Sequence, residues 1–560
     1  MAEYAFGANI LENLTTGMYQ DSKVIYREYI QNACDQIDKA EKLGILRPRD
    51  SQSKYPDLGA GVVNIWLNPD RRYIAIEDNA TGIKADEFQR TLGNIADSDK
   101  VMGVDKGFRG IGRLCGLAYC RQLVFTSRWA GEDIVSIMTC DALKMRAMIN
   151  ESNSNIKKHS AIDVLNAMVE FNTRSVEEDD EDHFFRVELI DINEENEELF
   201  GGNDDDNLEQ LSDYLSFVAP VPYQATFSYR SEIYTHAKEL DAHIDEYTIK
   251  IDGAQVFKKY KTHLKTGNGK DEVFGVQFHE FWNDDETELL SWLWFGKTSF
   301  KASIKEEETS RGLRLRKENI QIGESDTLRD MFTREASKRG NGYFIGEIFA
   351  TSKQLIPNSQ RSYFNENPVR LDFEHKLKDY CNNILYRIYQ DGSDVNARIK
   401  EVNAYVEKAA EFEKKKETDS FLSTDDFERE QAELEIKKLK AEKAKRTLER
   451  KKSESKSILT KQIIERRSNE ITNAVALNVN SEVTSRKAAS NSSAKKNVET
   501  EREDYKPKKK FLVDTMFPRA NRNERKLISE TLDKIFDIIQ NSTDKKTSDK
   551  IITKIKEELR

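Results

Sequence analysis

The sequence predicts an α+β protein whose first 394 residues form the folded domains and whose remaining part is helical and highly charged. Three observations predict this class. Residues 24–37 repeat apolar side chains at helical spacing, residues 72–77 alternate as a strand does, and Glu, Lys, Ala and Leu dominate from residue 395 onward. A chain of 560 residues is long enough for two or three domains with their own cores.

The first candidate for function is a polar row on the helix predicted over residues 24–37. Glu28, Asn32 and Asp35 stand at positions i, i+4 and i+7, so they share one helical face. Asp21 and Ser22 come just before this helix and are predicted to cap its start. Solvated polar faces are common on helices, so this row predicts no chemistry by itself.

Two further motifs follow in fixed order. The predicted strand at residues 72–77 ends in Asp78, and Gly82 follows four residues later. Residues 107–112 then read Gly-Phe-Arg-Gly-Ile-Gly ahead of an apolar run. Glycines at the start of a helix let backbone N–H groups approach a phosphate without a Cβ in the way, and the helix N-terminus adds partial positive charge. The chain has no G-x-x-x-x-G-K-[ST] loop as an alternative phosphate site.

Together the three motifs resemble the GHKL ATPase superfamily, which includes gyrase, the HtpG-type chaperones, MutL, the MORC proteins and the sensor histidine kinases. Residues 92–98 resemble the lid opening of the HtpG-type chaperones, whereas residues 107–110 are similar to MutL. The resemblance implies an N-terminal α/β sandwich of the Bergerat type and a following α+β transducer domain, with ATP and Mg²⁺ as the cofactors. Ala80 departs from the family pattern, which more often has glycine there, so the loop after Asp78 is expected to be tighter or slightly displaced.

The chemistry of ATP hydrolysis fits these residues. A carboxylate near the γ-phosphate can orient and deprotonate the attacking water, and Glu28 is our candidate for this general base. Mg²⁺ takes oxygen ligands, and we assign Asn32 as its protein ligand. The resemblance implies that Asp78 accepts the exocyclic amine of adenine and that Gly82 lets the base lie close to the backbone. The residues expected to bind ATP are Asn32, Asp35, Asp78, Gly82, Asn94, Gly107, Arg109, Gly110, Ile111 and Gly112.

A basic residue from the second domain is expected to complete the site. Arg361 follows Leu-Ile-Pro in a loop that resembles the γ-phosphate loop of HtpG-type chaperones and MORC proteins. Lys317, in an alternating segment at residues 312–323, is the alternative, because other superfamily members use a lysine from a neighbouring strand. The planar guanidinium of arginine suits the role because it neutralises two phosphate oxygens at once.

Composition predicts a cytoplasmic protein. The five cysteines form no C-x-x-C pair, which argues against disulfides and zinc. The N-terminus lacks a basic segment followed by an apolar one, and no 18 apolar residues run together, so neither a secretion signal nor a membrane segment is expected.

Charge is unevenly distributed along the chain. Residues 431–560 hold 33 basic and 21 acidic residues, a net charge of +12. Because the whole chain carries −11, residues 1–430 carry −23. The basic tail is either a solvated end or an electrostatic contact for nucleic acid or an acidic partner.

Shifts in pattern divide the chain into five parts. They are an ATP-binding domain (1–210), a transducer domain (211–394), a charged helical or coiled-coil region (395–468), a flexible basic linker (469–510) and a small helical element (511–560). Strands are predicted in the second part at 225–229, 247–251, 273–278, 290–295 and 343–350, with a helix over 372–389. Ser423 is predicted to cap a second charged helix, which forms either an antiparallel hairpin or an oligomer stalk.

These expectations favour an ATP-gated clamp that dimerises on binding ATP. It is expected to act on nucleic acid or as part of a DNA-maintenance or phage-defence complex, and a protein partner subunit is among the candidate partners. An HtpG-like chaperone with a protein client is the alternative. A histidine kinase is disfavoured, because that branch lacks a water activator of the Glu28 type and no histidine here lies on a suitable phosphoacceptor helix. A catalytically dead binding module is disfavoured by the presence of Glu28, Asn32 and Asp78.

Overall fold

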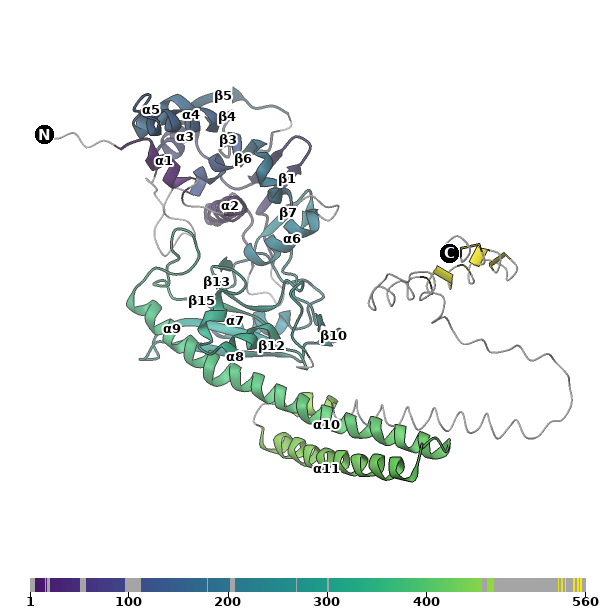
Figure 1. Cartoon of the computed structure of the whole chain (residues 1–560). Helices are drawn as coiled ribbons and strands as arrows, with labels where there is room; N and C mark the ends of the chain where they lie inside the picture. The colour runs from purple at the N-terminus through teal and green to yellow at the C-terminus, as the bar shows by residue number, and fades with distance from the viewer. Residues whose placement is uncertain are drawn as a thin grey trace. The chain divides into compact units, whose positions relative to one another are not determined.

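Figure 1 shows the computed structural model of the chain. The structure describes residues 6–15, 17, 21–50, 57–95, 112–178, 180–201, 207–267, 269–299, 302–455 and 461–467, with scattered positions between 532 and 555. The chain divides into two compact units, Met1–Leu477 and Asn478–Arg560. The described positions of the second unit are helical, and most of the helical element predicted over 511–560 lies outside the described residues.

An eight-stranded sheet forms the N-terminal part of the first unit, in the order β5-β4-β3-β6-β2-β1-β7-β8. Its strands are β1 (Val62–Asn68), β2 (Tyr73–Asp78), β3 (Cys120–Arg128), β4 (Ile134–Asp141), β5 (Val169–Ser175), β6 (Phe184–Ile192), β7 (Thr248–Ile251) and β8 (Ala254–Gln255). The predicted strand at 72–77 is confirmed as β2, which lies between β1 and β6 and is antiparallel to both. This central place buries the end of β2, where Asp78 stands.

Helices pack on this sheet around one apolar core. They are α1 (Asn9–Leu14), α2 (Val24–Lys42), α3 (Ala85–Gly93), α4 (Ala142–Asn153), α5 (Ala161–Met168) and α6 (Asn207–Val218), with the short 3₁₀ helices η1 (Gly112–Ala118) and η2 (Glu194–Phe200). The predicted helix is confirmed as α2, and its apolar residues Ile25, Ile30 and Ile37 are buried in this core. Burying one such side chain contributes roughly 1.5–3 kcal/mol, so α2 is firmly held.

The cap predicted for α2 is wrong. The residue before the helix is Lys23, and no side chain caps the helix there. The Ser22 hydroxyl donates instead to Glu198 in η2, far along the chain, and the Asp21 carboxylate accepts from the Lys23 N–H at 3.0 Å. Ser22 therefore makes a tertiary hydrogen bond in place of the predicted cap.

A second sheet, in the order β11-β12-β15-β13-β14, forms the middle of the first unit. Its strands are β11 (Val276–Trp282), β12 (Leu289–Lys297), β13 (Gly312–Lys317), β14 (Ile320–Ile322) and β15 (Phe344–Ala350), and β9 (His263–Thr266) pairs with β10 (Gly269–Glu272) beside them. Residues of β12 alternate between two cores, Trp292 and Trp294 in one and Leu293 and Phe295 in the other.

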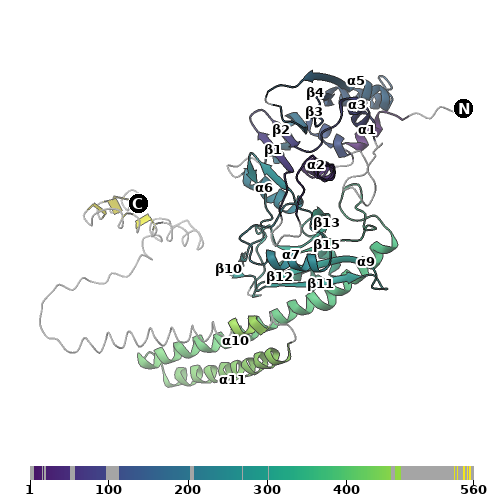
Figure 2. The ribbon, with the colours of Figure 1, turned by 180° about the vertical axis from the view of Figure 1, so that it is seen from behind.

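Helices cover both faces of this second sheet. They are α7 (Arg230–Glu239), α8 (Glu335–Lys338) and α9 (Pro368–Tyr380), with the 3₁₀ helices η3 (Thr327–Met331) and η4 (Arg339–Tyr343). Ile233 of α7 joins the core of Trp294, whereas Phe373 of α9 joins the core of Leu293. In the views of Figures 1 and 2, α2 lies between the N-terminal sheet and strands β13 and β15.

Three of the five strands predicted in this part are confirmed as β7, β12 and β15. The prediction at 273–278 overlaps only the start of β11, and the prediction at 225–229 is wrong, because these residues form turns before α7. Phe227 explains the error. Its ring lies 5.8 Å from that of Trp294, so the aromatic pattern that suggested a strand fills the core instead.

Between residues 221 and 260 the chain passes three times between the N-terminal core and the core of Trp294 in the second sheet, which we call the middle core. Val221 belongs to the N-terminal core, Ile233 to the middle core, Ile249 again to the N-terminal core and Tyr260 again to the middle core. The return is made by β7, which pairs in parallel with β1. The predicted boundary after residue 210 therefore falls within α6, and two strands of the N-terminal sheet come from beyond it.

A buried polar cluster joins the returning segment to the second sheet. Lys258 Nζ donates to Glu347 at 3.0 Å and to the Asn319 side chain at 2.7 Å, and all three residues are buried. Arg316 also donates to Glu347, and the Asn319 amide donates to the backbone oxygen of Asp245 at 2.5 Å. Asn319 therefore fixes the turn between β13 and β14 to the segment that leads into β7.

A helical hairpin follows the second sheet. A single π turn at Cys381–Leu385 connects α9 to α10 (Tyr386–Glu417), and α11 (Thr424–Glu454) runs back along α10. Ser423 accepts from the Asp426 N–H at 3.1 Å, which confirms the predicted cap. Of the two predicted arrangements, the antiparallel hairpin is the one the structure has (Figure 2). No helix among the described residues is long and apolar enough to cross a membrane.

Candidate active site

The polar row of α2 forms the centre of the candidate site. Glu28 and Asn32 are half-buried, whereas Asp35 is 6% exposed. The opposite side of the helix is held by apolar residues in the N-terminal core, so these three side chains stand on a rigid element. The sequence placed them on one face, and α2 is helical through all three positions.

Glu28 lies directly against the third motif. A Cβ built on Gly112, the first residue of η1, would overlap Glu28 Oε2 and lie 3.1 Å from its Cδ. Only glycine leaves this carboxylate in place. Gly107, Arg109, Gly110 and Ile111 lie outside the described residues, so Gly112 is the part of this motif that the structure describes.

Tyr29, which the sequence did not single out, connects α2 to η1. Its hydroxyl donates to the backbone oxygen of Arg113 at 3.0 Å and accepts from the Gly116 N–H at 3.1 Å. Burial raises the pKa of this phenol well above its ordinary value, so the hydroxyl keeps its proton. No sequence signal marks this role, because an apolar-faced helix commonly buries an aromatic residue.

The second motif reaches α2 near Asp35. Asp78, 3% exposed, accepts from the Ala80 N–H at 3.1 Å, and the Thr81 hydroxyl donates to Gln36 of α2 at 3.2 Å. Gly82 has a φ of +67°, and a Cβ there would overlap the backbone oxygen of Arg128. Glycine is therefore required at residue 82 by the fold itself.

Ala80, the departure from the family pattern, is fully buried in this turn. Its carbonyl oxygen lies 2.5 Å from His183 Nδ1, and a contact with the residue before β6 thus holds the turn. In the sheet, Asp78 is paired with Phe185 of β6. The loop after Asp78 is consequently fixed from two sides.

Asn94 follows the end of α3, and its backbone oxygen accepts a hydrogen bond from the Arg113 guanidinium. Arg113 is the neighbour of Gly112, so this contact joins the predicted lid opening at residues 92–98 to the end of the glycine motif. Burial lowers the pKa of Arg113 from its ordinary value, although arginine remains charged. Residues 96–111, which include the last three residues of the predicted lid opening at 92–98, lie outside the described residues.

Arg361 of the middle part lies beside the polar row of α2. It is 5% exposed, and burial lowers its pKa. The negative charges of Glu318, Glu28 and Asp35 act in the opposite direction and raise this pKa. Its φ of +52° is in the left-handed region, and its backbone oxygen accepts from the Gly323 N–H at 2.7 Å. The structure thus brings together an arginine and two carboxylates that are more than 300 residues apart in the chain.

Arg27, the neighbour of Glu28, holds the loop that carries Arg361. Arg27 Nη2 donates to the backbone oxygen of Gln360 at 2.8 Å, across 333 positions of sequence. The sequence did not single out this residue, and an arginine beside the polar row carries no signal that predicts so distant a partner.

Lys317, the alternative basic residue, ends β13 and is 6% exposed. Its Nζ donates to the backbone oxygen of Ser352 at 2.8 Å. Burial lowers the pKa of Lys317, and the charge of Arg361 lowers it further, which places the two cations near each other. Both candidates therefore lie at the side of the middle part that meets α2.

Among the described residues, no group of three or more His, Cys, Asp and Glu side chains is arranged to hold a metal ion. The polar row itself offers carboxylate and amide oxygens. These are the donors that Mg²⁺ prefers, and this ion is usually held by one or two protein oxygens together with phosphates and water.

Comparisons with known proteins agree with this geometry. Residues 23–178 match the family model described as histidine kinase-, DNA gyrase B-, and HSP90-like ATPase. The chain is also similar to the chaperone protein HtpG of Salinispora tropica, with 34% identity over 89 residues, 16% of this chain and 13% of that protein. The match to HtpG of Rickettsia rickettsii is 31% over 150 residues, 24% of this chain and 23% of that protein.

A third relative, HtpG of Acinetobacter baylyi, is 30% identical over 136 residues, 22% of this chain and 21% of that protein. The matched part spans less than a quarter of the length of each of these three relatives. The family match covers α2 with its polar row, β2 with Asp78, and Gly112. Residues 23–178 of this chain therefore match the ATPase domain of the GHKL superfamily.

Proposed function

We propose that this protein hydrolyses ATP, with Glu28 as the general base that activates the attacking water. The observation that carries the proposal is the hydrogen bond from Arg27 of α2 to the backbone oxygen of Gln360, which holds the loop of Arg361 at α2, where the charges of Glu28 and Asp35 act on this arginine. In phosphoryl transfer the protein mainly positions the nucleophile and neutralises charge. Glu28 would position the attacking water, and Arg361 would neutralise charge on the phosphate. Gly112 and Tyr29 keep the base in position through η1.

The remaining residues of the proposed site would bind the nucleotide. Asp78 would accept the adenine amine, and Asn32 would contribute its amide oxygen to Mg²⁺. When bound, Mg²⁺ would neutralise phosphate charge. Asp35 and Asn94 are also proposed to bind the nucleotide, with Gly82 beside the base. The proposed phosphate contacts come from the glycine motif, namely Gly107, Arg109, Gly110, Ile111 and Gly112.

We further propose that Arg361, rather than Lys317, contacts the γ-phosphate. The charges of Glu28 and Asp35 of α2 act on Arg361, whereas Lys317 Nζ donates to the backbone oxygen of Ser352. A charge on the phosphate would then draw the middle part toward α2, which is how binding of ATP would close a dimeric clamp. Homodimerisation on binding ATP, Mg²⁺ as a cofactor and a cytoplasmic location are parts of this proposal.

The test of catalysis is Glu28→Gln, which keeps the volume of the side chain against Gly112 and removes its basicity. We expect ATP binding in titration calorimetry to persist, phosphate release to be lost, and light scattering with ATP to report a trapped dimer. Lys42→Ala, at the exposed end of α2, is the control and should behave as the wild type. Normal turnover by Glu28→Gln would refute the assignment.

The proposed client is nucleic acid, on the evidence of the basic C-terminal part. A deletion from residue 431 would cut α11, so the test should remove 478–560, which form a unit of their own. This unit holds 20 basic and 14 acidic residues, a net charge of +6. We expect its removal to weaken binding to duplex DNA and to flatten the salt dependence of that binding.

The second candidate is a protein client, and it is favoured by the similarity to chaperones named HtpG. The two candidates differ in one measurement. If DNA binding is absent, or is unchanged by removal of 478–560, while the chain suppresses aggregation of an unfolded protein in an ATP-dependent way, the protein client is correct.

A further inference from the structure

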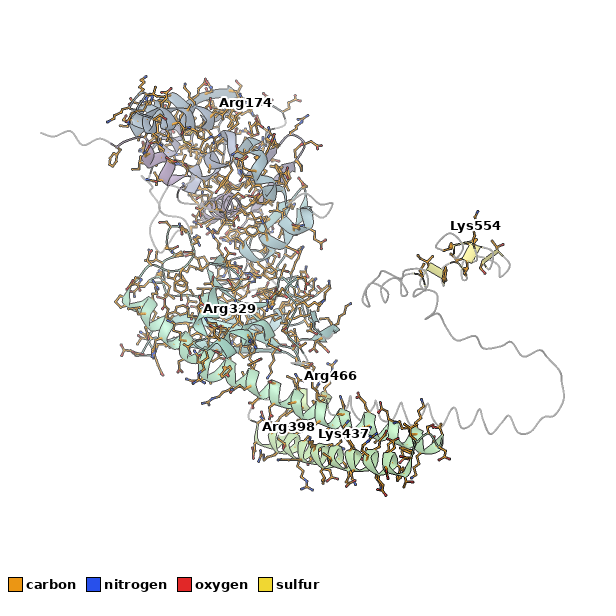
Figure 3. All side chains as sticks on the ribbon, in the orientation of Figure 1. Arg174, Arg329, Arg398, Lys437, Arg466 and Lys554 are labelled. Carbon is orange, nitrogen blue, oxygen red and sulfur yellow. The ribbon has the colours of Figure 1, made fainter. Side chains whose placement is uncertain are left out.

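One face of α11 in the helical hairpin packs against α10, and the opposite face is exposed to solvent. Ala441, Ala444 and Leu448 of α11 are buried against α10, where Lys451 pairs with Asp391 at 2.7 Å. At about 100° per residue, positions 428, 432, 435, 439, 443, 446 and 450 lie on the opposite side of α11, which we call the outer face. All seven residues are exposed, and Figure 3 shows side chains of α11 projecting away from α10.

Apolar residues lie at the centre of the outer face. Leu439 is 61% exposed, and Ile436, at its edge, is 55% exposed. These are unusual positions for large aliphatic side chains on a helix in which charged residues dominate, and their exposure costs about 1.5–3 kcal/mol each relative to full burial. A partner that covered them would recover part of this free energy.

The charges of the outer face divide at this centre. Glu428 and Glu435 lie on its N-terminal half, whereas the C-terminal half carries Lys443, Arg446 and Arg450. Glu442 and Glu449 lie toward one flank, about 60° to 80° away from Leu439 around the helix. The outer face is therefore acidic at one end, apolar in the middle and basic at the other end.

Such a face is complementary to itself under two-fold symmetry. If the axis passes by Leu439 and a second α11 runs antiparallel, residue 435 meets residue 443 of the other copy, and residue 428 meets residue 450. Each contact then pairs a glutamate with a lysine or arginine, twice by symmetry. A parallel arrangement would place like charges together, which disfavours it.

We propose that the outer face of α11 binds the outer face of a second copy of this chain, in an antiparallel pair centred on Leu439. Glu435 pairs with Lys438 of its own helix at 3.4 Å, but an exposed pair of this kind is weak enough to exchange. Two helices in contact over this length bury less than the roughly 1,200 Å² typical of stable complexes, so the association is weak and depends on concentration. It needs no nucleotide, which separates it from dimerisation on binding ATP.

The first experiment exchanges charges in the full chain, without nucleotide, and measures molar mass by sedimentation up to about 100 μM. We expect the wild type to approach twice the monomer mass. Glu428→Lys with Glu435→Lys makes the outer face uniformly basic, and Lys443→Glu with Arg446→Glu and Arg450→Glu makes it uniformly acidic. Each variant should remain a monomer alone, and an equimolar mixture of the two should form the dimer.

The control is Lys440→Glu with Lys445→Glu, which changes exposed charges of α11 away from the outer face and should leave the wild-type association intact. A wild type that stays monomeric, or charge variants that dimerise alone, would overturn the proposal. Circular dichroism of each variant checks that the hairpin remains helical, so a loss of association is not mistaken for unfolding.

The second experiment tests the antiparallel register by disulfide formation. The five native cysteines are all buried, so an added surface cysteine reports on its own contacts. In Leu439→Cys, the cysteines of the two copies lie opposite each other across the two-fold axis, so this variant should form a disulfide-linked dimer. Ala432→Cys should not crosslink alone, but should do so when mixed with Arg446→Cys. Efficient crosslinking of Ala432→Cys with itself would show a parallel pair and contradict the proposal.

Discussion

The carboxylate of Glu28 lies so close to Gly112 that a Cβ at residue 112 would overlap Glu28 Oε2. The two residues come from different motifs, one on α2 and one at the start of η1. The glycine that ends the third motif therefore determines where the proposed general base can stand, in addition to any part it has in binding phosphate.

Gly112→Ala is predicted to impair hydrolysis without unfolding the domain. The atom in the way is the far end of a flexible side chain, so Glu28 turns aside and the fold remains. A displacement of about 1 Å at a catalytic group costs up to about 100-fold in rate, and we expect kcat to fall by about 10-fold to 100-fold with little change in melting temperature. Gly340→Ala, where the nearest atom would lie at an ordinary 3.5 Å, is the matched control.

Substitutions of Arg361 and Lys317 are predicted to have different effects, the first on the rate of hydrolysis and the second on stability. We expect Arg361→Ala to lower kcat by about 100-fold or more, because it removes a cation beside the transferred phosphate. Lys317→Met should mainly lower stability, by about 0.5–1.5 kcal/mol, because it removes the Nζ donor of the Ser352 backbone oxygen, which keeps the Leu355 N–H at 3.2 Å. Lys353→Ala, exposed in the same loop as Arg361, is the control. A larger kinetic effect for Lys317→Met would reverse the assignment.

Tyr29→Phe is predicted to loosen η1 from α2. The substitution keeps the ring and removes the hydroxyl that bridges the Arg113 oxygen and the Gly116 N–H. Two buried polar groups lose a partner, which should cost about 1–3 kcal/mol in the free energy of unfolding. Denaturant unfolding of the full chain measures this, and hydrogen exchange at residues 113–116 should quicken. Unchanged exchange there would show that the bridge does not hold η1.

The buried carboxyl of Glu246 is predicted to make the free energy of unfolding depend on pH. Burial raises the pKa of this carboxyl from 4.5 to about 8, and Tyr234 donates to it at 2.9 Å. The folded chain therefore holds a proton that the unfolded chain releases above pH 4.5, so the stability contributed by this group is lost as pH rises from about 4.5 toward 8.

Glu246→Gln should flatten this dependence between pH 5 and pH 7, measured by denaturant unfolding followed through the fluorescence of the tryptophans, two of which, Trp292 and Trp294, lie in the neighbouring core. The window stops at pH 7 because burial lowers the pKa of Lys258 to about 7, and above that pH Lys258 contributes stability that rises with pH. An equal slope for the variant and the wild type would remove Glu246 as the cause.

Local periodicity was sufficient to predict what lies within one element. Helical spacing put Glu28, Asn32 and Asp35 on one face, and alternation located β2 with Asp78 at its end. Arg361 was predicted only through its resemblance to a family loop, since nothing in the spacing of the chain connects it to α2.

What sequence reasoning missed depends on partners far away in the chain. Tyr29 bonds to residues 84 and 87 positions later, and Arg27 to one 333 positions later, so neither role leaves a local pattern. The strand β7 was predicted, but its pairing with β1 was not, because alternation shows that a segment is a strand and not which sheet it joins. Ser22 was predicted to cap α2 and instead bonds to Glu198 for the same reason.

The threefold passage of the chain between the N-terminal and middle cores limits how the two can move. Three backbone links, together with the hydrogen bonds of Asn319 and Lys258, restrict the relative movement of these cores more than a single link would. A shift of α2 against the second sheet is therefore resisted by the turn after Lys317, which Asn319 fixes, and by the loop of Arg361, which Arg27 holds.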